Sequence, residues 1–191
     1  MPQKSVAILA VQSDEYIIET EHPARRRDLG KDGASVEKRK YYLAYGSNLN
    51  IRQMRTRCPE ARIIGTAEIP DYQLLFKGSG TGAYLTIEPK KGAAVPVGVW
   101  SVTAADEAAL DVYEGFPNFY YKKEMTVAVK DIQSGKTRRR KAFVYIMHEE
   151  RRLGLPTQTY VNTCATGYQA FGFELDFLRD AIKASGGEAA K

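Results

Sequence analysis

Short β-like segments recur along most of the chain, and their number restricts the fold more than any other feature. Beyond residue 40 they lie at about 41–45, 72–76, 83–88, 95–101, 124–130 and 141–147. Few helical stretches lie between them, whereas a doubly wound parallel sheet needs a helix after almost every strand. The pattern therefore predicts an α+β fold with a small mixed, largely antiparallel β-barrel or sheet flanked by helices.

Helical stretches are expected at 50–57, 103–114, 157–171 and 174–183. The second has the clearest boundaries. Thr103-Ala104-Ala105-Asp106 resembles a capping box, which begins a helix. The helix should end near Glu114, because Gly115 can adopt the left-handed conformation and Pro117 prevents continuation.

The first 40 residues differ from the remainder. Two short strands are expected at 5–11 and 15–20, and the charged stretch 22–40 shows no apolar periodicity and is typical of a linker. A chain of 191 residues suits one domain plus an extension. The sequence therefore predicts an N-terminal extension over 1–40, a folded domain over 41–184 and a tail over 185–191.

Composition restricts the class of protein. The chain has 43% hydrophobic and 27% charged residues, as globular proteins with a buried core do. No apolar run approaches the ~20 residues that cross a bilayer, and Ser5–Val11 is too short for a signal peptide and lacks a cleavage site. We therefore expect a cytoplasmic protein with no membrane partner. Cys58 and Cys164 lie outside any Cys-x-x-Cys pattern and are expected to be free, partly buried thiols.

The net charge of +5 raises the alternative of a nucleic-acid partner. The basic clusters are Arg25–Arg27, Lys38–Lys40, Arg138–Lys141 and Arg151–Arg152. None has aromatic residues between its charges or a recognition-helix pattern. Arg138–Lys141 follows the turn signal at 133–136 and should enter a hairpin strand, where a solvated face is the simpler interpretation. Nucleic acid is therefore not the partner that we expect.

The segment 41–49, Tyr-Tyr-Leu-Ala-Tyr-Gly-Ser-Asn-Leu, is the most informative, because an aromatic strand runs into a glycine and then a helix start. Gly46 allows the backbone to turn and approach a ligand closely. Asn48 is a good N-cap, and free N–H groups beyond it can face a carboxylate. On these residues alone, a simple turn and helix cap explains the pattern equally well.

A second motif, Asp111-Val-Tyr-Glu-Gly-Phe-Pro117, lies downstream, and with it the chain resembles the γ-glutamylcyclotransferase-like family over residues 41 to about 180. Tyr45–Leu49 is similar to the substrate loop of that family, and Leu110–Gly115 to the segment that carries its catalytic glutamate. Further similarity lies in Gly82–Pro89 with Val97–Trp100, and in Leu155-Pro156-x-x-x-Tyr160. The resemblance implies a small twisted β-barrel flanked by helices, no cofactor, and release of 5-oxoproline and an amine from a small γ-glutamyl substrate.

The chain departs from the family pattern at two places. Related sequences often have Tyr-x-Arg after the Glu-Gly-x-Pro segment, whereas this chain has Tyr120-Tyr121-Lys122, so a point charge replaces a planar fork. The extension over 1–40 has no counterpart in the compact members of the family.

Glu114 is the expected catalytic base and acid. In a γ-glutamyl compound the α-amine can close a five-membered ring on the γ-carbonyl, so the reaction needs only a proton transfer and a polarised carbonyl. The helix C-terminus and the apolar neighbours Val112, Tyr113 and Phe116 are expected to raise the pKa of Glu114. The alternative is a surface glutamate beside a helix stop.

The residues expected to bind substrate are Leu43, Ala44, Tyr45, Gly46, Ser47, Asn48 and Tyr120. Tyr45 and Tyr120 would line the pocket, or else pack in the core with a hydrogen-bonded hydroxyl. Backbone N–H groups of 46–48 would hold the substrate carboxylate or polarise its carbonyl, and the sequence does not distinguish these tasks.

Other sequence features give weaker indications of function. Lys77–Gly82 lacks the ending of a phosphate loop and is expected to be a hairpin loop beside the pocket. His22 and His148 form no recognisable triad or metal site. Arg52, Arg55 and Arg57 either extend the positive field of the loop or form a solvated helix face.

Three hypotheses therefore stand at this point: a γ-glutamyl cyclotransferase, a catalytically silent binding module of the same fold, and a nucleic-acid accessory protein. The first is the one that we expect. Neither the leaving amine nor the oligomeric state follows from the sequence.

Overall fold

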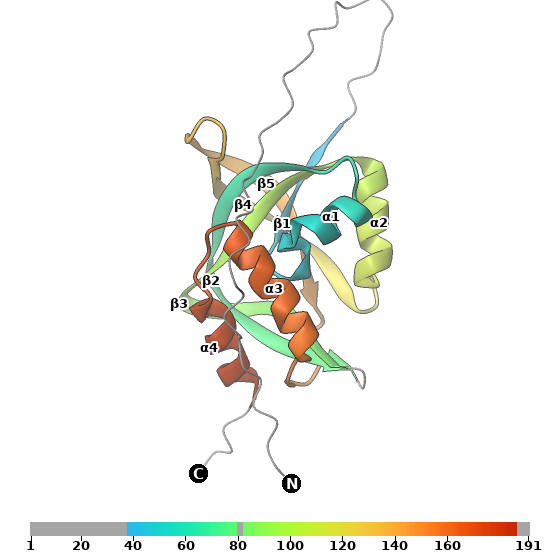
Figure 1. Cartoon of the computed structure of the whole chain (residues 1–191), viewed down its shortest axis with the longest axis vertical. Helices are drawn as coiled ribbons and strands as arrows, with labels where there is room; N and C mark the ends of the chain where they lie inside the picture. Colours follow the sequence, from blue (N-terminus) through green and yellow to red (C-terminus); the bar gives the residue numbers. More distant parts are fainter. Residues whose placement is uncertain (1–37, 80–81, 187–191) are drawn as a thin grey trace, which may run out of the picture.

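A closed β-barrel is the centre of the computed structural model, which describes residues 38–79 and 82–186 (Figure 1). Its strands are β1 (Lys40–Ala44), β2 (Arg62–Ser79), β3 (Gly82–Val102), β4 (Tyr120–Asp131) and β5 (Thr137–Met147). They follow the order β1-β3-β2-β4-β5, and β1 closes the barrel by pairing in parallel with β5. All other pairs are antiparallel, which confirms the predicted mixed, largely antiparallel barrel.

The strands β2 and β3 are longer than the sequence predicts. The segments 83–88 and 95–101 belong to one strand, and β2 extends well before residue 72. The prediction left residues 89–94 between two separate segments, but the strand continues there through an irregularity in which Gly92 contacts Asp71. Both residues have positive φ there, and Asp71 Oδ1 accepts a hydrogen bond from Gly92 N–H at 2.8 Å. The irregularity therefore bends the strand without ending it.

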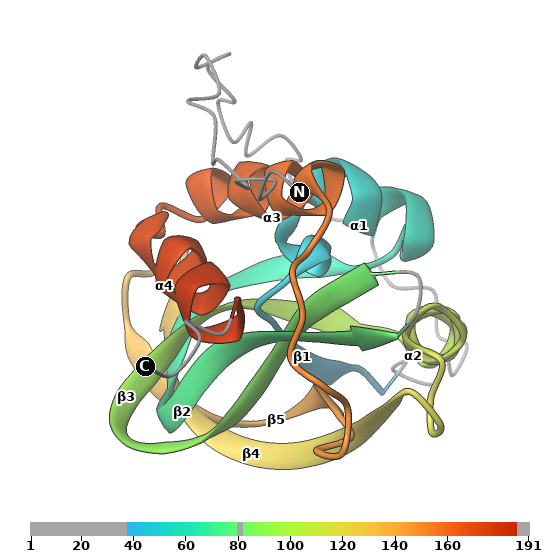
Figure 2. The same ribbon diagram turned by 90° about the horizontal axis from the view of Figure 1, so that it is seen from below.

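In the part of the chain that the structure describes, four α-helices flank the barrel: α1 (Ile51–Arg57), α2 (Ala104–Glu114), α3 (Gln158–Ala170) and α4 (Asp176–Ser185). In Figure 2, α1 and α3 lie on one side of the barrel, and α2 lies apart from them. A 3₁₀ turn, η1 (Ser47–Leu49), joins β1 to α1. It packs under α3, where Gly167 is so close to Leu49 that a Cβ would lie 2.6 Å from it.

The predicted ends of α2 are confirmed. The Thr103 hydroxyl accepts a hydrogen bond from Asp106 N–H, and the Asp106 carboxylate accepts one from Thr103 N–H, both at 3.1 Å. Gly115 ends the helix with φ 62° and ψ 35°. Glu114 is therefore the last residue of α2, next to a fixed turn.

The structure also bears on several other predictions from the sequence. Cys58 and Cys164 are free, as predicted, but both are fully buried and not partly buried. Arg138–Lys141 lies in β5 with mostly exposed side chains, which supports the solvated face. Within the described residues, no helix is both long and apolar enough to span a bilayer. The strands predicted at 5–11 and 15–20 lie outside the described residues, as do His22 and Arg25–Arg27.

Candidate active site

The two sequence motifs meet on the surface of the barrel. The first continues from β1, whose last residue pairs with Gly98, into η1. The second is the C-terminal turn of α2. A hydrogen bond of 2.8 Å from Asn48 Nδ2 to Glu114 Oε1 joins them. Residues 66 positions apart in the chain are thereby in direct contact.

Asn48 is the centre of a hydrogen-bonded network. Its Nδ2 also donates to the Tyr42 hydroxyl at 2.8 Å, and its Oδ1 accepts from Arg57 at 2.6 Å. The expectation that Asn48 is an N-cap is wrong. Asn50 caps α1 by accepting from Gln53 N–H, because η1 delays the helix and turns Asn48 toward Glu114.

Arg57 and Tyr113 cover this network on the outside. The Arg57 Cζ lies 3.5 Å from the centre of the Tyr113 ring, and the Tyr113 hydroxyl is 3.1 Å from the Ser47 hydroxyl. Ser47 is buried, whereas Tyr113 is 46% exposed. Of the three helix α1 arginines considered from sequence, only Arg57 hydrogen bonds to Asn48.

Burial raises the pKa of Glu114 from 4.5 to about 7, and it outweighs the opposing effects of the Arg57 charge and the Asn48 hydrogen bond. The proposed source of that burial needs correction, because Val112 is 84% exposed and Phe116 is 39% exposed. The carboxyl group instead contacts Asn48, which is buried. A glutamate in this state is partly ionised near neutral pH and can both accept and return a proton.

The two candidate pocket tyrosines are buried, and both hydroxyls donate to main-chain carbonyls. Tyr45 donates to Tyr145 O at 2.6 Å, and Tyr120 donates to Leu85 O at 2.9 Å. These bonds fit the alternative of core packing with a satisfied hydroxyl. The tyrosines can shape the site, but their hydroxyl protons are already used.

Gly46 lies at a position where space is short. A Cβ on it would lie 3.2 Å from the Tyr160 hydroxyl and 3.6 Å from Leu85 Cβ. The Tyr160 hydroxyl also accepts a hydrogen bond from Leu85 N–H at 3.2 Å. The loop therefore runs close to the same stretch of β3 that holds Tyr120.

The remaining members of the predicted binding set differ in their accessibility. Leu43 and Ala44 are fully buried in β1, so their side chains belong to the core. Ser47 and Asn48 begin η1, and the first amides of any helix lack an acceptor within it. The structure thus brings Gly46–Asn48, Tyr45, Tyr120 and Glu114 into one region, with Leu43 and Ala44 beneath it.

Lys122 holds α2 on the barrel. Its Nζ lies 2.7 Å from Glu107 Oε1 and 2.7 Å from Asp111 Oδ1. The Tyr145 hydroxyl donates to the same Asp111 carboxylate at 2.6 Å. Lys122 therefore positions the helix that ends at Glu114.

The predicted hairpin loop Lys77–Gly82 lies where β2 and β3 pair, but its described residues belong to the two strands: Lys77 pairs with Tyr84 and Gly78 with Ala83. Within the described chain, one group of possible metal ligands brings its atoms within 4.8 Å of one another: His148, Glu149 and Glu150. The Tyr121 hydroxyl binds Glu149 and Pro117 O contacts His148, so both have protein partners.

Comparison with known proteins assigns the family. The family model described as "Gamma-glutamyl cyclotransferase, AIG2-like" matches residues 42–162, which include both motifs. The chain belongs to this family. No curated protein sequence matches it.

Solved structures similar to this AIG2-like cyclotransferase family member agree with the assignment. One described as a gamma-glutamyl cyclotransferase is 26% identical, with a TM-score of 0.65 over 81% of this chain and 93% of the other. An uncharacterized protein from Homo sapiens is 27% identical, with a TM-score of 0.65 over 81% and 92%. YkqA from Bacillus subtilis, 15% identical with a TM-score of 0.62 over 78% and 56%, shares the fold.

Sequence reasoning missed the roles of Tyr42 and Tyr113, and it did not separate Arg57 from its neighbours. Tyr42 lies one residue before the predicted binding set, and Tyr113 was considered only as an apolar neighbour. Both carry a polar hydroxyl inside a motif, which is the signal that could have indicated them.

Proposed function

We propose that this family member cyclises the γ-glutamyl group of a small substrate to 5-oxoproline and releases an amine, with Glu114 as general base and acid. One observation carries the proposal: the Glu114 carboxyl, with a pKa of about 7, is held by Asn48 of the Tyr-Gly-Ser-Asn loop. Two motifs distant in sequence thus form one site around a group suited to proton transfer at neutral pH.

The proposed reaction proceeds in two steps. The α-amine nitrogen of the substrate attacks the γ-carbonyl carbon, and the Glu114 carboxylate takes a proton from that nitrogen. The tetrahedral intermediate then collapses, the bond to the leaving nitrogen breaks, and Glu114 returns the proton to that nitrogen. Glu114 is unchanged after the cycle, and no water is consumed.

The loop would supply the remaining assistance. The Ser47 and Asn48 amides begin η1, where a carboxylate or a developing oxyanion could accept from them. Tyr45 and Tyr120 would form the walls of the site. Their hydroxyls would not donate a proton to the substrate, because both already donate to main-chain carbonyls. The site therefore favours polarisation by main-chain groups over a tyrosine proton donor.

The reaction requires proton transfer and carbonyl polarisation, with no change in oxidation state, so we expect that it needs no cofactor. Activity should survive chelation by EDTA. A loss of activity on chelation that one specific metal restores would contradict this part of the proposal.

The decisive experiment is 5-oxoproline release from a panel of γ-glutamyl amino acids, γ-glutamylamines and glutathione. The α-glutamyl isomer of each active peptide is the matched control, because its α-amine cannot displace the same leaving nitrogen by five-membered ring closure. Release from γ-glutamyl substrates alone is expected. Binding of these compounds without any 5-oxoproline would instead support the catalytically silent module.

A further inference from the structure

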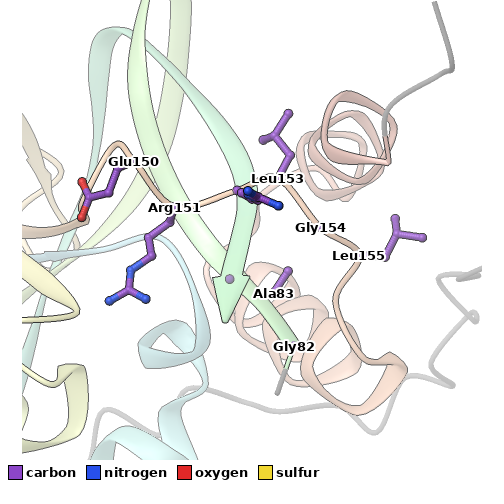
Figure 3. Close-up of a pocket in the computed structure, with 9 residues that line it drawn as sticks. Gly82, Ala83, Glu150, Arg151, Leu153, Gly154 and Leu155 are labelled. Atoms are coloured by element: carbon purple, nitrogen blue, oxygen red, sulfur yellow. The ribbon is translucent and has the colours of Figure 1, made fainter. Parts of the chain in front are cut away.

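A cavity of about 720 Å³ lies between the β2–β3 hairpin and the segment 150–155, which leads from β5 toward α3 (Figure 3). Hydrogen bonds fix that segment to β2. Gly78 N–H donates to Arg152 O, and Gly154 N–H donates to Phe76 O, both at 3.1 Å. The segment thus lies along the edge of β2, and these hydrogen bonds hold the backbone that carries its side chains in place.

Arg151 is the half-buried cation of this segment, whereas Arg152 is exposed. The Arg151 Nε is shielded from solvent, and among the described residues it has no hydrogen-bond partner. In Figure 3 its side chain extends away from Leu153 and Leu155. Its Cζ lies 4.8 Å from the centre of the Phe119 ring, a contact that restrains the guanidinium plane. An arginine fixed in this way is prepared for a planar anion.

Partly buried aromatic rings connect Arg151 with the Glu114 region. Phe119 Cβ would be 3.1 Å from a Cβ on Gly115, the residue after Glu114. The Phe119 ring is 5.3 Å from Tyr120 and 6.3 Å from Tyr84, measured between ring centres. A molecule with one end at Glu114 could therefore lie over Phe119 and reach Arg151 with its other end.

We propose that Arg151 binds a carboxylate on the leaving portion of the substrate and is thereby a specificity-determining residue. The proposal rests on the proposed function, because it assigns the γ-glutamyl end to Glu114. It selects substrates whose leaving amine is itself an amino acid or peptide over those that release an uncharged alkylamine. Because Nε is shielded, the carboxylate would accept from the two terminal nitrogens in a bidentate pair.

The charge of the cavity favours this ligand class. Among its described lining residues, Arg151 and Arg152 are cationic and Glu150 is the one acidic residue. Glu150 is exposed, so water and salt screen its carboxylate more than they screen a partly buried group. The Phe119 ring beside Arg151 excludes water from one face of the guanidinium, which strengthens a bond to an anion.

The test compares two substrates that differ in a single charge, γ-glutamyl-6-aminohexanoate and its C-terminal amide. The wild-type chain should prefer the acid in kcat/KM, and Arg151→Gln should lower kcat/KM for the acid by roughly 10-fold, the scale of a lost charged hydrogen bond. The amide should be unaffected. Arg139→Gln is the matched control, because it removes an exposed arginine charge of β5 that does not line the cavity.

Binding to a Glu114→Gln chain, measured by calorimetry, separates this inference from the proposed function. An acid-over-amide preference that Arg151→Gln abolishes and Arg139→Gln retains supports Arg151 even if no chain releases 5-oxoproline. Equal binding of acid and amide, or a preference that survives Arg151→Gln, overturns it even if 5-oxoproline is released. Thermal melting establishes that each variant is folded.

Discussion

Glu114 can be altered at the residue scale without losing its contact to the loop. Glu114→Gln keeps an oxygen that accepts from Asn48 Nδ2 but removes the ability to take and return a proton. Because general acid–base assistance is worth about 10²- to 10⁴-fold, kcat for 5-oxoproline release should fall by at least two orders of magnitude. Substrate binding should persist. Glu124→Gln, on an exposed residue of β4, is the control.

The same variant also makes a stability prediction with a definite sign. The pKa of Glu114 is about 7 in the folded chain and ordinarily 4.5, so the folded state binds this proton more tightly than the unfolded state. The stability that this group contributes is therefore present at acid pH and lost as pH rises through about 7. Glu114→Gln should melt at least as high as the wild type at pH 8.5.

Near-wild-type turnover by the folded variant would exclude Glu114 as the base.

Arg57 should control the pH at which Glu114 works. Its charge lowers the pKa of Glu114, so Arg57→Met should raise that pKa further and move the rise of kcat to higher pH. We expect a loss of roughly 3- to 10-fold near pH 6.5 that largely disappears by pH 9. Arg55→Met, on the same helix, should leave the profile in place. A loss that is equal at every pH would mean that Arg57 has a structural role only.

At this scale the sequence predicted which residue types matter but not all of their partners. The two motifs indicated Glu114 and Asn48. The three arginines of 52–57 look equivalent along the chain, and only the turn of η1 decides that Arg57 faces Asn48. A hydrogen bond between residues far apart in sequence leaves no local sequence pattern from which it could be predicted.

At the scale of elements, α2 depends on Lys122 of β4. Lys122→Met would leave Glu107 and Asp111 without this cation, although Lys40 also pairs with Glu107 at 2.7 Å. The Lys122 side chain is 19% exposed, so the loss of unfolding free energy should lie below the 3–5 kcal/mol of a fully buried pair, at about 2 kcal/mol.

Urea denaturation measures this loss, and kcat should fall with it, because α2 carries Glu114. Lys122→Arg should restore most of both quantities, because an arginine keeps a positive charge beside Glu107 and Asp111. Lys123→Met is the control, because Lys123 contacts only the exposed Tyr72 hydroxyl among its described hydrogen-bond partners. Unchanged stability in Lys122→Met would show that the ion pairs do not hold α2.

Helix ends were predictable because their signals are local, as Thr103 and Gly115 show. Strand lengths were not. Gly65 resembles a breaker, yet it lies within β2 where a Cβ would be only 1.9 Å from Lys130 O. The glycine is needed for the close approach of β4, and that requirement is visible only once both strands are in place.

At the scale of the whole molecule, the sequence predicted a barrel flanked by helices, and the structure confirms it. The strand pattern allowed either a sheet or a barrel, and only the family resemblance predicted that the barrel is closed. The parallel contact between β1 and β5 joins Tyr41 to Ala142 and Tyr42 to Phe143. Strands a hundred residues apart carry no shared pattern that would indicate their pairing.

The last prediction concerns the extension over 1–40, which we expect to be dispensable for chemistry. Both motifs lie after it, and β1 begins at Lys40. A chain that starts at residue 38 keeps Arg39, which donates to Ser101 Oγ at 2.9 Å and to Glu60 O at 2.6 Å. Its kcat should match that of the full chain. A chain that starts at residue 41 loses these bonds, so it should melt at lower temperature with kcat still largely intact. If the chain starting at residue 38 folds but releases 5-oxoproline much more slowly, the extension contributes to the pocket and the proposed domain boundary is wrong.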